Sequence, residues 1–390
     1  MAFRWPFCGM TLLAGFAFSS VALRAQKEEQ TPLLFAVPDA PVPFLGSDHK
    51  THLVYELWTT NFSSTDIVVE KVEVLGDGAS IAELDRAEIA KRLQPAGLRD
   101  PVGTLPKSTQ ALLFLHLTLP EGAVVPRQIT HRVSGTASGA PPGHEHFTET
   151  SSATAIDKPN VALIHPPLGG DGYISADSCC DASRHTRAAL AINGRVWISQ
   201  RYAVDWEQLD ANGRIYSGPR ERLESYTIFG KPVLAVAEAT VVSAIDGLPE
   251  QIPGKFPDNI ALEEADGNSV ILDLGSSRFA LYAHMQPGSV RVHRGDKVHP
   301  GQVLGLVGNT GNSIAPHLHF QVMSVPSSFT SNGLPYEIEG FRVTGESPGT
   351  DAFDAAEANG TPLAIRSLTA PQPVERGLPL DQRILSFPAR

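Results

Sequence analysis

The sequence predicts a mainly β protein with two domains, an N-terminal β-sandwich followed by a domain of antiparallel strands. Polar and apolar residues alternate in short segments along most of the chain, and this two-residue period is typical of strands with one buried face. Glycine, proline and asparagine separate these segments at turn positions. A stretch rich in Ser, Thr, Gly and Pro at residues 134–158 predicts a linker between the two groups of strands.

The first 25 residues have the composition of a secretory signal peptide. They contain no acidic residue, and an apolar stretch from Phe7 to Leu23 follows Arg4 and precedes polar chain. No later segment approaches the ~20 consecutive apolar residues of a membrane span. We therefore expect an exported protein, periplasmic or extracellular, without a membrane span.

Charge and cysteine content exclude some classes of partner and of fold. Without residues 1–25 the chain has 29 basic and 42 acidic residues, a net charge of −13. Nucleic-acid-binding proteins carry a basic surface, so no nucleic-acid partner is expected. The two remaining cysteines, Cys179 and Cys180, are neighbours and cannot link distant segments. A disulfide between them, two free thiols and a metal-binding role all stay open.

Residues 31–133 are predicted to form a β-sandwich, immunoglobulin-like in architecture. The clearest strands lie at residues 52–58, 67–74 and 111–119. Ser80 and Glu83 have the spacing of a capping box and predict one helix among these strands. Nothing here indicates chemistry, and His116 is expected to be a core or edge residue. The sandwich is a candidate for positioning the second domain or for binding a protein partner.

Residues 160–343 are predicted to form the second domain, which is dense in short strands and glycines. Its expected strands lie at residues 232–242, 269–274, 279–284 and 303–307. Residues 345–390 are rich in Pro, Ala and Thr and have little periodicity. We expect them to form a tail that is disordered or ordered only in patches.

The most informative stretch of the second domain is "HLHFQV", residues 317–322. Strict alternation directs its apolar residues to a core and places His317, His319 and Gln321 on the opposite face. The two histidines then lie roughly 7 Å apart, so that one can bind a metal ion while the other stands beside a water molecule. His144 and His146 have the same spacing but no flanking alternation, and we interpret them as a loop pair.

Four segments follow one another in the second domain: "GKPVLAVAEATV", "LYAHM", "VHRGDKVHPGQVLGLVGNTG" and "APHLHFQV". In order and spacing they resemble the lysostaphin-type zinc metallopeptidases, exported enzymes that cut peptidoglycan cross-bridges and stem peptides. The resemblance covers about residues 200–322. It implies a compact antiparallel β fold with a groove above the sheet, one zinc ion per chain, and peptidoglycan or its peptide stems as the substrate.

The resemblance also implies roles for individual residues. The zinc ligands of the family fall on Asp205 and His319, and its two catalytic histidines fall on His284 and His317. Zinc binds imidazole nitrogen and carboxylate oxygen, and a catalytic zinc keeps one position open for water. Two neutral histidines can orient that water and stabilise the oxyanion of the scissile carbonyl. Three polar residues are expected near the rim of the groove: Asn309, Thr310 and Asn312.

One position departs from the family. The first zinc ligand, a histidine four residues before Asp205, is replaced by Arg201, which has no lone pair to offer a metal. His185 is a candidate replacement, because a hairpin turning at Asn193-Gly194 would bring it beside residue 202. Alternatively Arg201 binds a carboxylate of the substrate or pairs with Asp205. On an extended strand residue 201 would face the same way as Asp205, so a histidine there is expected to share its metal.

The sequence thus favours an exported zinc-dependent endopeptidase that acts on peptidoglycan peptides by attack of metal-activated water. A second hypothesis stays open because of Arg201. In it the groove has lost its activity, and the protein binds cell-wall peptides or regulates another hydrolase.

Overall fold

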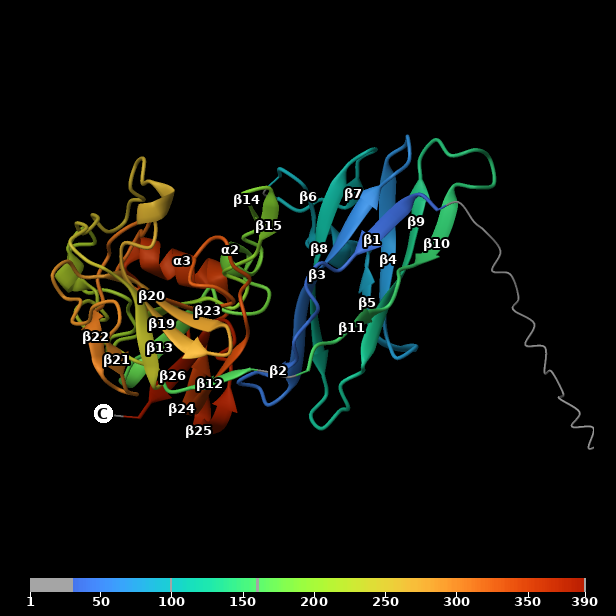
Figure 1. Ribbon diagram of the computed structural model, residues 1–390. Coiled ribbons are helices and arrows are strands. Elements are labelled where there is room, and N and C mark those ends of the chain that lie inside the picture. The colour runs from blue at the N-terminus through green and yellow to red at the C-terminus, as the bar shows by residue number, and fades with distance from the viewer. Residues whose placement is uncertain (1–30, 99, 159–160, 389–390) are drawn as a thin grey trace, which may run out of the picture.

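The computed structural model describes residues 31–98, 100–158 and 161–388, which form two β lobes lying side by side (Figure 1). The mainly β prediction is confirmed. The signal-peptide prediction for residues 1–25 lies outside the described residues. Among the described residues no helix has both the length and the apolar character needed to cross a membrane.

The N-terminal lobe is built from two sheets. The first has the order β1 (Leu33–Ala36), β3 (Thr51–Asn61), β8 (Gln110–Leu119) and β6 (Leu93–Pro95), with β2 (Phe44–Leu45) beside β3. The second has the order β10 (His146–Thr150), β9 (Gln128–Ala137), β4 (Ile67–Gly76) and β5 (Ala79–Asp85), and the short strands β7 (Thr104–Leu105) and β11 (Thr154–Ala155) pair with β4 and β9. Alternate residues of β3, β8, β4 and β9 share one buried core, as the two-residue period predicts. The immunoglobulin-like architecture of this sandwich stays a prediction.

Two predictions for this lobe are wrong. Ser80 and Glu83 lie in strand β5, because pairing with β4 satisfies the backbone groups that a helix would satisfy internally. The helix, α1 (Arg86–Ala90), follows, and its capping box is made by Asp85 and Glu88, with bonds of 2.9 and 3.1 Å. Residues 134–158 are not a linker either, since they contain the end of β9 and the strands β10 and β11 that pair with it.

The C-terminal lobe contains an 11-stranded sheet. Its order is β12 (Ala162–Ile164), β24 (Tyr336–Glu346), β26 (Arg383–Phe387), β13 (Gly170–Ala176), β16 (Val204–Gln208), β23 (Leu318–Met323), β20 (Arg278–Met285), β19 (Asn268–Gly275), β18 (Ala239–Ile245) and β21 (Lys297–Val298), with β25 (Arg366–Gly377) paired to β24. Two small sheets accompany it, β14 (Leu190–Ile192) with β15 (Arg195–Trp197) and β17 (Pro232–Leu234) with β22 (Val303–Leu306). The helical segments are α2 (Ser183–Thr186), η1 (Leu223–Ser225), η2 (Leu262–Glu264) and α3 (Thr350–Asn359). The buried face of β23 lies in the main core of this lobe.

The predicted tail at residues 345–390 is also wrong. Strand β26 lies between β24 and β13 inside the large sheet, and its Leu385 is fully buried. Strand β25 pairs with β24 but is mostly exposed, so backbone hydrogen bonds hold it and its side chains need no apolar alternation. The C-terminal domain therefore continues well past residue 343.

Buried polar groups join the two lobes. The Arg201 guanidinium donates two hydrogen bonds to the Glu56 carboxylate of β3, Nε to Oε1 at 2.9 Å and Nη2 to Oε2 at 2.7 Å. Arg201 is 5% exposed and Glu56 2% exposed. The Tyr202 hydroxyl donates to the carbonyl of Val54, also on β3. These bonds fix the start of β16 against the sandwich.

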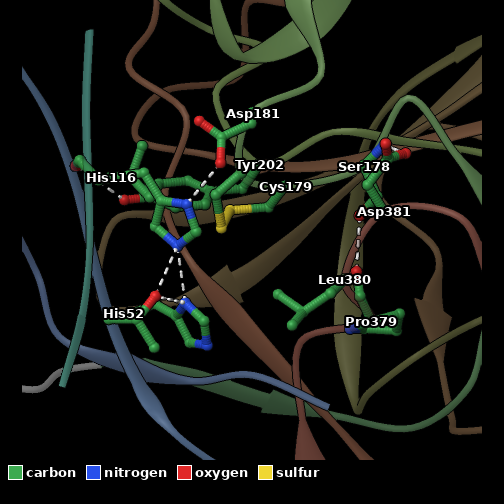
Figure 2. The surroundings of a disulfide bond; sticks show 12 residues. His52, His116, Ser178, Cys179, Asp181, Tyr202, Pro379, Leu380 and Asp381 are labelled. Carbon is green, nitrogen blue, oxygen red and sulfur yellow. Dashed lines mark hydrogen bonds and ion pairs between the residues drawn. A yellow bond between two sulfur atoms is a disulfide. The ribbon is translucent and has the colours of Figure 1, made fainter. Parts of the chain in front are cut away.

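A second junction surrounds a disulfide between Cys179 and Cys180, which decides among the three alternatives for these cysteines (Figure 2). His116 of β8 lies between His52 and Asp181, at 2.8 Å from each. Cys180 is close enough to His52 and His116 to complete a group of three metal-ligand atoms. Because metals bind the thiolate form of cysteine, a disulfide sulfur does not provide the third ligand.

Candidate active site

The centre of the site is made by two neighbouring strands of the large sheet. Asp205 of β16 is paired directly with His319 of β23, so their side chains share one face of the sheet. His319 Nδ1 lies 2.9 Å from Asp205 Oδ1. His317, just before β23, places Nε2 at 3.5 Å from the same oxygen. The structure thus brings these three predicted residues together.

His284 comes from the next strand of the sheet, β20, where it is the penultimate residue. Its ring centroid lies 4.6 Å from that of His317 and 6.0 Å from that of His319. The backbone of His284 has φ +64°, which is unusual for a residue with a side chain. Hydrogen bonds hold it there: its N–H donates to Asp266 and its carbonyl accepts from Gly308. His284 therefore lies beside His317, the other position on which a catalytic histidine of the family falls.

His185 also reaches the site. Its Nε2 lies 3.5 Å from Asp205 Oδ2, and its ring centroid is 4.9 Å from that of His319. The predicted turn at Asn193-Gly194 exists, with positive φ at both residues, but its hairpin ends after three residue pairs. His185 lies in helix α2 instead, beside residue 205 rather than 202. The prediction that a hairpin brings His185 to the site is wrong, although His185 does lie in the site.

Arg201 does not take part in the site. Residues 198–203 form turns before β16 begins, so residue 201 does not share a strand face with Asp205. Its side chain points to Glu56, 2.7 Å away, and it does not line the pocket that contains the histidines. The expectations that Arg201 pairs with Asp205, binds a substrate carboxylate, or marks a ligand position are therefore wrong.

Hydrogen bonds on the outer side of the site determine which nitrogen of each of the four imidazoles carries the hydrogen. In each ring one nitrogen lies 2.7–3.0 Å from a carbonyl oxygen, which can only accept a hydrogen bond. These bonds join His185 to Asp177, His284 to Thr310, His317 to Ala315, and His319 to Gln321. In the neutral ring the other nitrogen then carries a lone pair. In His185, His317 and His319 that nitrogen faces the Asp205 carboxylate.

This arrangement fits a zinc ion. Ligand atoms of His185, Asp205 and His319 all lie within 4.8 Å of one another. Two acceptors such as His319 Nδ1 and Asp205 Oδ1, 2.9 Å apart, need a positive charge between them, either a proton or a metal ion. Two imidazoles and one carboxylate are a common protein ligand set for catalytic zinc. A carbonyl on the outer nitrogen of a ligating histidine is the usual way to orient it.

The electrostatics agree with neutral His185 and His284 near an ionised Asp205 carboxylate. Burial alone would raise the pKa of Asp205, but His185, His317 and His319 hold it well below its ordinary value. Burial lowers the pKa of His284, and the neighbouring His317 and His319 lower it further. Burial also lowers the pKa of His185. Burial alone would lower the pKa of His319, but its hydrogen bond to Asp205 and the charge of that carboxylate, together with Gln321 and Asp266, raise it.

The pocket has a volume of about 460 Å³ and includes residues that the sequence analysis missed. One wall belongs to α3, from the segment predicted to be a tail, and includes Phe353 and Glu357. The sequence does contain a signal for this helix. Phe353 and Ala356 have helical spacing, and a glycine follows at position 360, where it takes the left-handed conformation of a helix C-cap.

The polar residues expected at the rim are divided between two roles. Asn312 lines the pocket, whereas Asn309 and Thr310 are fully buried behind it. The Thr310 carbonyl accepts from His284 Nδ1. The Asn309 side chain accepts a hydrogen bond from Ser313 Oγ, which lies 3.2 Å from His317 Nδ1. These two residues therefore support the histidines.

Comparison with known proteins identifies the domain. The model of peptidase family M23 matches residues 225–332, a segment that contains His284, His317 and His319. The chain carries a lysostaphin-type M23 peptidase domain. The match begins after Asp205, so the family model covers neither Asp205 nor His185.

Curated relatives that are similar to part of this chain include proteins of staphylococci and of Vibrio. Lysostaphin of Staphylococcus staphylolyticus is 31% identical over 155 residues, covering 38% of this chain and 28% of the relative. Glycyl-glycine endopeptidase ALE-1 of Staphylococcus capitis is 34% identical over 148 residues, covering 37% and 35%. Peptidoglycan DD-endopeptidase ShyA of Vibrio cholerae is 39% identical over 57 residues, covering 15% and 13%. The chain spans about a third or less of the length of these relatives.

Among solved structures, the catalytic domain of lysostaphin from Staphylococcus simulans is similar to part of this chain, with 26% sequence identity. The likeness covers 42% of this chain and 86% of that domain, with a TM-score of 0.23.

Proposed function

We propose that this protein is an exported zinc-dependent endopeptidase that cleaves peptidoglycan peptides, with zinc held by His185, Asp205 and His319. The observation that carries the proposal is the convergence of these three ligand atoms within 4.8 Å, beside two further histidines. The family match supports the reaction, and the glycyl-glycine endopeptidase and the peptidoglycan DD-endopeptidase among the relatives support the substrate class. His185 takes the place of the family histidine that Arg201 replaces.

His284 and His317 are placed to move the proton of the reaction. When bound, zinc supplies a Lewis acid that activates water and polarises the scissile carbonyl. The Nδ1 atoms of His284 and His317 are held by the carbonyls of Thr310 and Ala315, so in the neutral rings each Nε2 carries the lone pair that accepts a proton from the attacking water. Once protonated, the same nitrogen donates to the oxyanion or to the leaving amine.

The low pKa of His284 suits this task, because the ring is neutral and ready to accept a proton near neutral pH. Both rings are at most 8% exposed, so little water competes for them. The N-terminal lobe contributes by position: Glu56 holds Arg201, which lies four residues before Asp205. We infer that the sandwich positions the catalytic lobe, and a further partner for it stays a prediction.

The test is release of soluble fragments from purified peptidoglycan by zinc-loaded protein. Parent protein is expected to release new amino termini, and a chelator should stop it. His284→Ala and His317→Ala should each lower the rate ~10²- to 10⁴-fold, the usual contribution of a proton-transferring residue. His293→Ala is the matched control, because His293 is exposed and lies outside the pocket. Zinc-loaded parent that binds peptidoglycan without releasing fragments would favour the alternative of a binding or regulatory protein.

A further inference from the structure

The wall of the pocket beside the zinc ligands is acidic. Two arginines, Arg184 and Arg220, stand against four carboxylates there: Asp177, Glu207, Asp354 and Glu357. Arg184 is already bound on both sides, with hydrogen bonds of 2.9 Å to Asp177 and of 3.1 and 2.5 Å to Asp354. Both aspartates therefore already share a cationic partner within the protein, and the two glutamates remain.

Glu207 and Glu357 are buried without a full set of partners. They are 5% and 9% exposed, and both line the pocket. Glu207 Oε2 and Glu357 Oε1 have no hydrogen-bond donor among the residues that the structure describes, so Arg220 on the same wall does not reach these oxygens. A buried acceptor without a donor costs about 1–3 kcal/mol, and more when it is charged. Their position calls for a cationic donor from outside the chain.

The two glutamates come from different elements and meet in the same pocket. Glu207 lies two residues after Asp205 on β16, so both side chains point to the same face of the sheet, roughly 7 Å apart along the strand. Glu357 lies on α3, which lines the same pocket. Each carboxylate disfavours the charge on the other unless a cation is shared between them.

The geometry favours an organic cation over a second metal ion. Within the described parts of the chain, three or more ligand atoms gather within 4.8 Å at only two places, and neither includes Glu207 or Glu357. A calcium or zinc ion would need more protein ligands than these two residues provide. A primary ammonium group needs only hydrogen-bond acceptors for its three N–H donors.

We infer that Glu207 and Glu357 form a subsite that binds a protonated primary amine of the substrate peptide, about two residues from the scissile bond. This inference rests on the proposed function, because it takes the neighbouring histidines and Asp205 to be the reaction centre. It assigns the substrate class as peptides with a free amine, whether on a side chain or at a chain end. The competing state is a proton shared by the two carboxyl groups.

The test compares soluble peptidoglycan peptides with the same peptides after acetylation of their free amines. Binding is measured by calorimetry in zinc-loaded His284→Ala protein, which removes the proposed proton acceptor so that binding is read without turnover. Acetylation is expected to weaken binding at least 10-fold. In the same background Glu207→Gln and Glu357→Gln, which keep the shape and remove the charge, should reduce this ratio to about 2-fold or less. Glu375→Gln, at an exposed position of β25, should leave the ratio unchanged.

Equal affinity for both peptide forms, or binding of neither, overturns the subsite. An unchanged loss of affinity on acetylation in both glutamine variants also overturns it. A rise in the thermal stability of these variants would then show that the two carboxyl groups share a proton. Circular dichroism checks that each variant is folded. A preference for free amines together with no fragment release by the zinc-loaded parent would contradict the endopeptidase function and leave the amine subsite standing.

Discussion

Replacement of Arg201 by methionine is expected to destabilise the protein without removing a zinc ligand. The change leaves the Glu56 carboxylate, only 2% exposed, without its bonds of 2.9 and 2.7 Å. It also removes the donor to the Gly333 carbonyl. Removing one partner of a buried ion pair costs about 3–5 kcal/mol, mostly because the other charge stays buried and unpaired.

The assay is urea denaturation, followed by zinc analysis of the folded protein. Arg201→Met should lose about 3–5 kcal/mol of unfolding free energy, and adding Glu56→Gln should restore much of it, because the stranded charge is gone. Arg201→His should gain no zinc affinity, since residue 201 faces Glu56 rather than Asp205. A loss below about 1 kcal/mol, or a gain of zinc in Arg201→His, would refute this reasoning.

Three further predictions concern stability. Burial alone would raise the pKa of Asp48, but His52 lowers it to about 2. Asp48 therefore stabilises the fold by about 1–2 kcal/mol above pH ~4, and this stabilisation is lost as the pH falls through 2. Urea curves of parent and Asp48→Asn should converge over that range, and a constant difference would contradict the pairing. Removing the chain beyond β24 takes β26 out of the sheet, and a soluble product with a cooperative melt would count against this topology. Gly311→Ala should cost at least about 2 kcal/mol in urea denaturation, because φ is +76° and a Cβ would lie 2.3 Å from the Gly267 nitrogen. Gly194→Ala, with a similar φ and open space, should cost only about 1 kcal/mol, and equal losses would contradict the role of the contact.

The part of the site that the sequence predicts is the part fixed by local periodicity. Alternation along residues 317–322 directs Phe320 to the core and His319 to the opposite face, and both directions hold in the structure. The position of His284 near the end of a strand is local in the same sense. A strand pattern carries this information because each side chain's face follows from its neighbours in sequence.

The position of His185, the proposed substitute ligand, depends on contacts that no local pattern contains. His185 reaches Asp205 from a four-residue helix, and Arg201 is turned away by Glu56, 145 positions earlier in the chain. The strands at residues 134–158 and 366–377 are held by backbone pairing and have largely polar or exposed side chains. Their sequence therefore lacks the apolar alternation by which a strand is recognised.

The proposed zinc site depends on His185, rather than on residue 201, as its third protein ligand. The direct test is the zinc content per chain of purified protein after dialysis, measured for parent, His185→Ala and the control His293→Ala. We predict one zinc per chain in the parent and in the control, and none in His185→Ala, with the fold retained by circular dichroism. Full zinc content in His185→Ala, or no zinc in a folded parent after loading, would contradict the account.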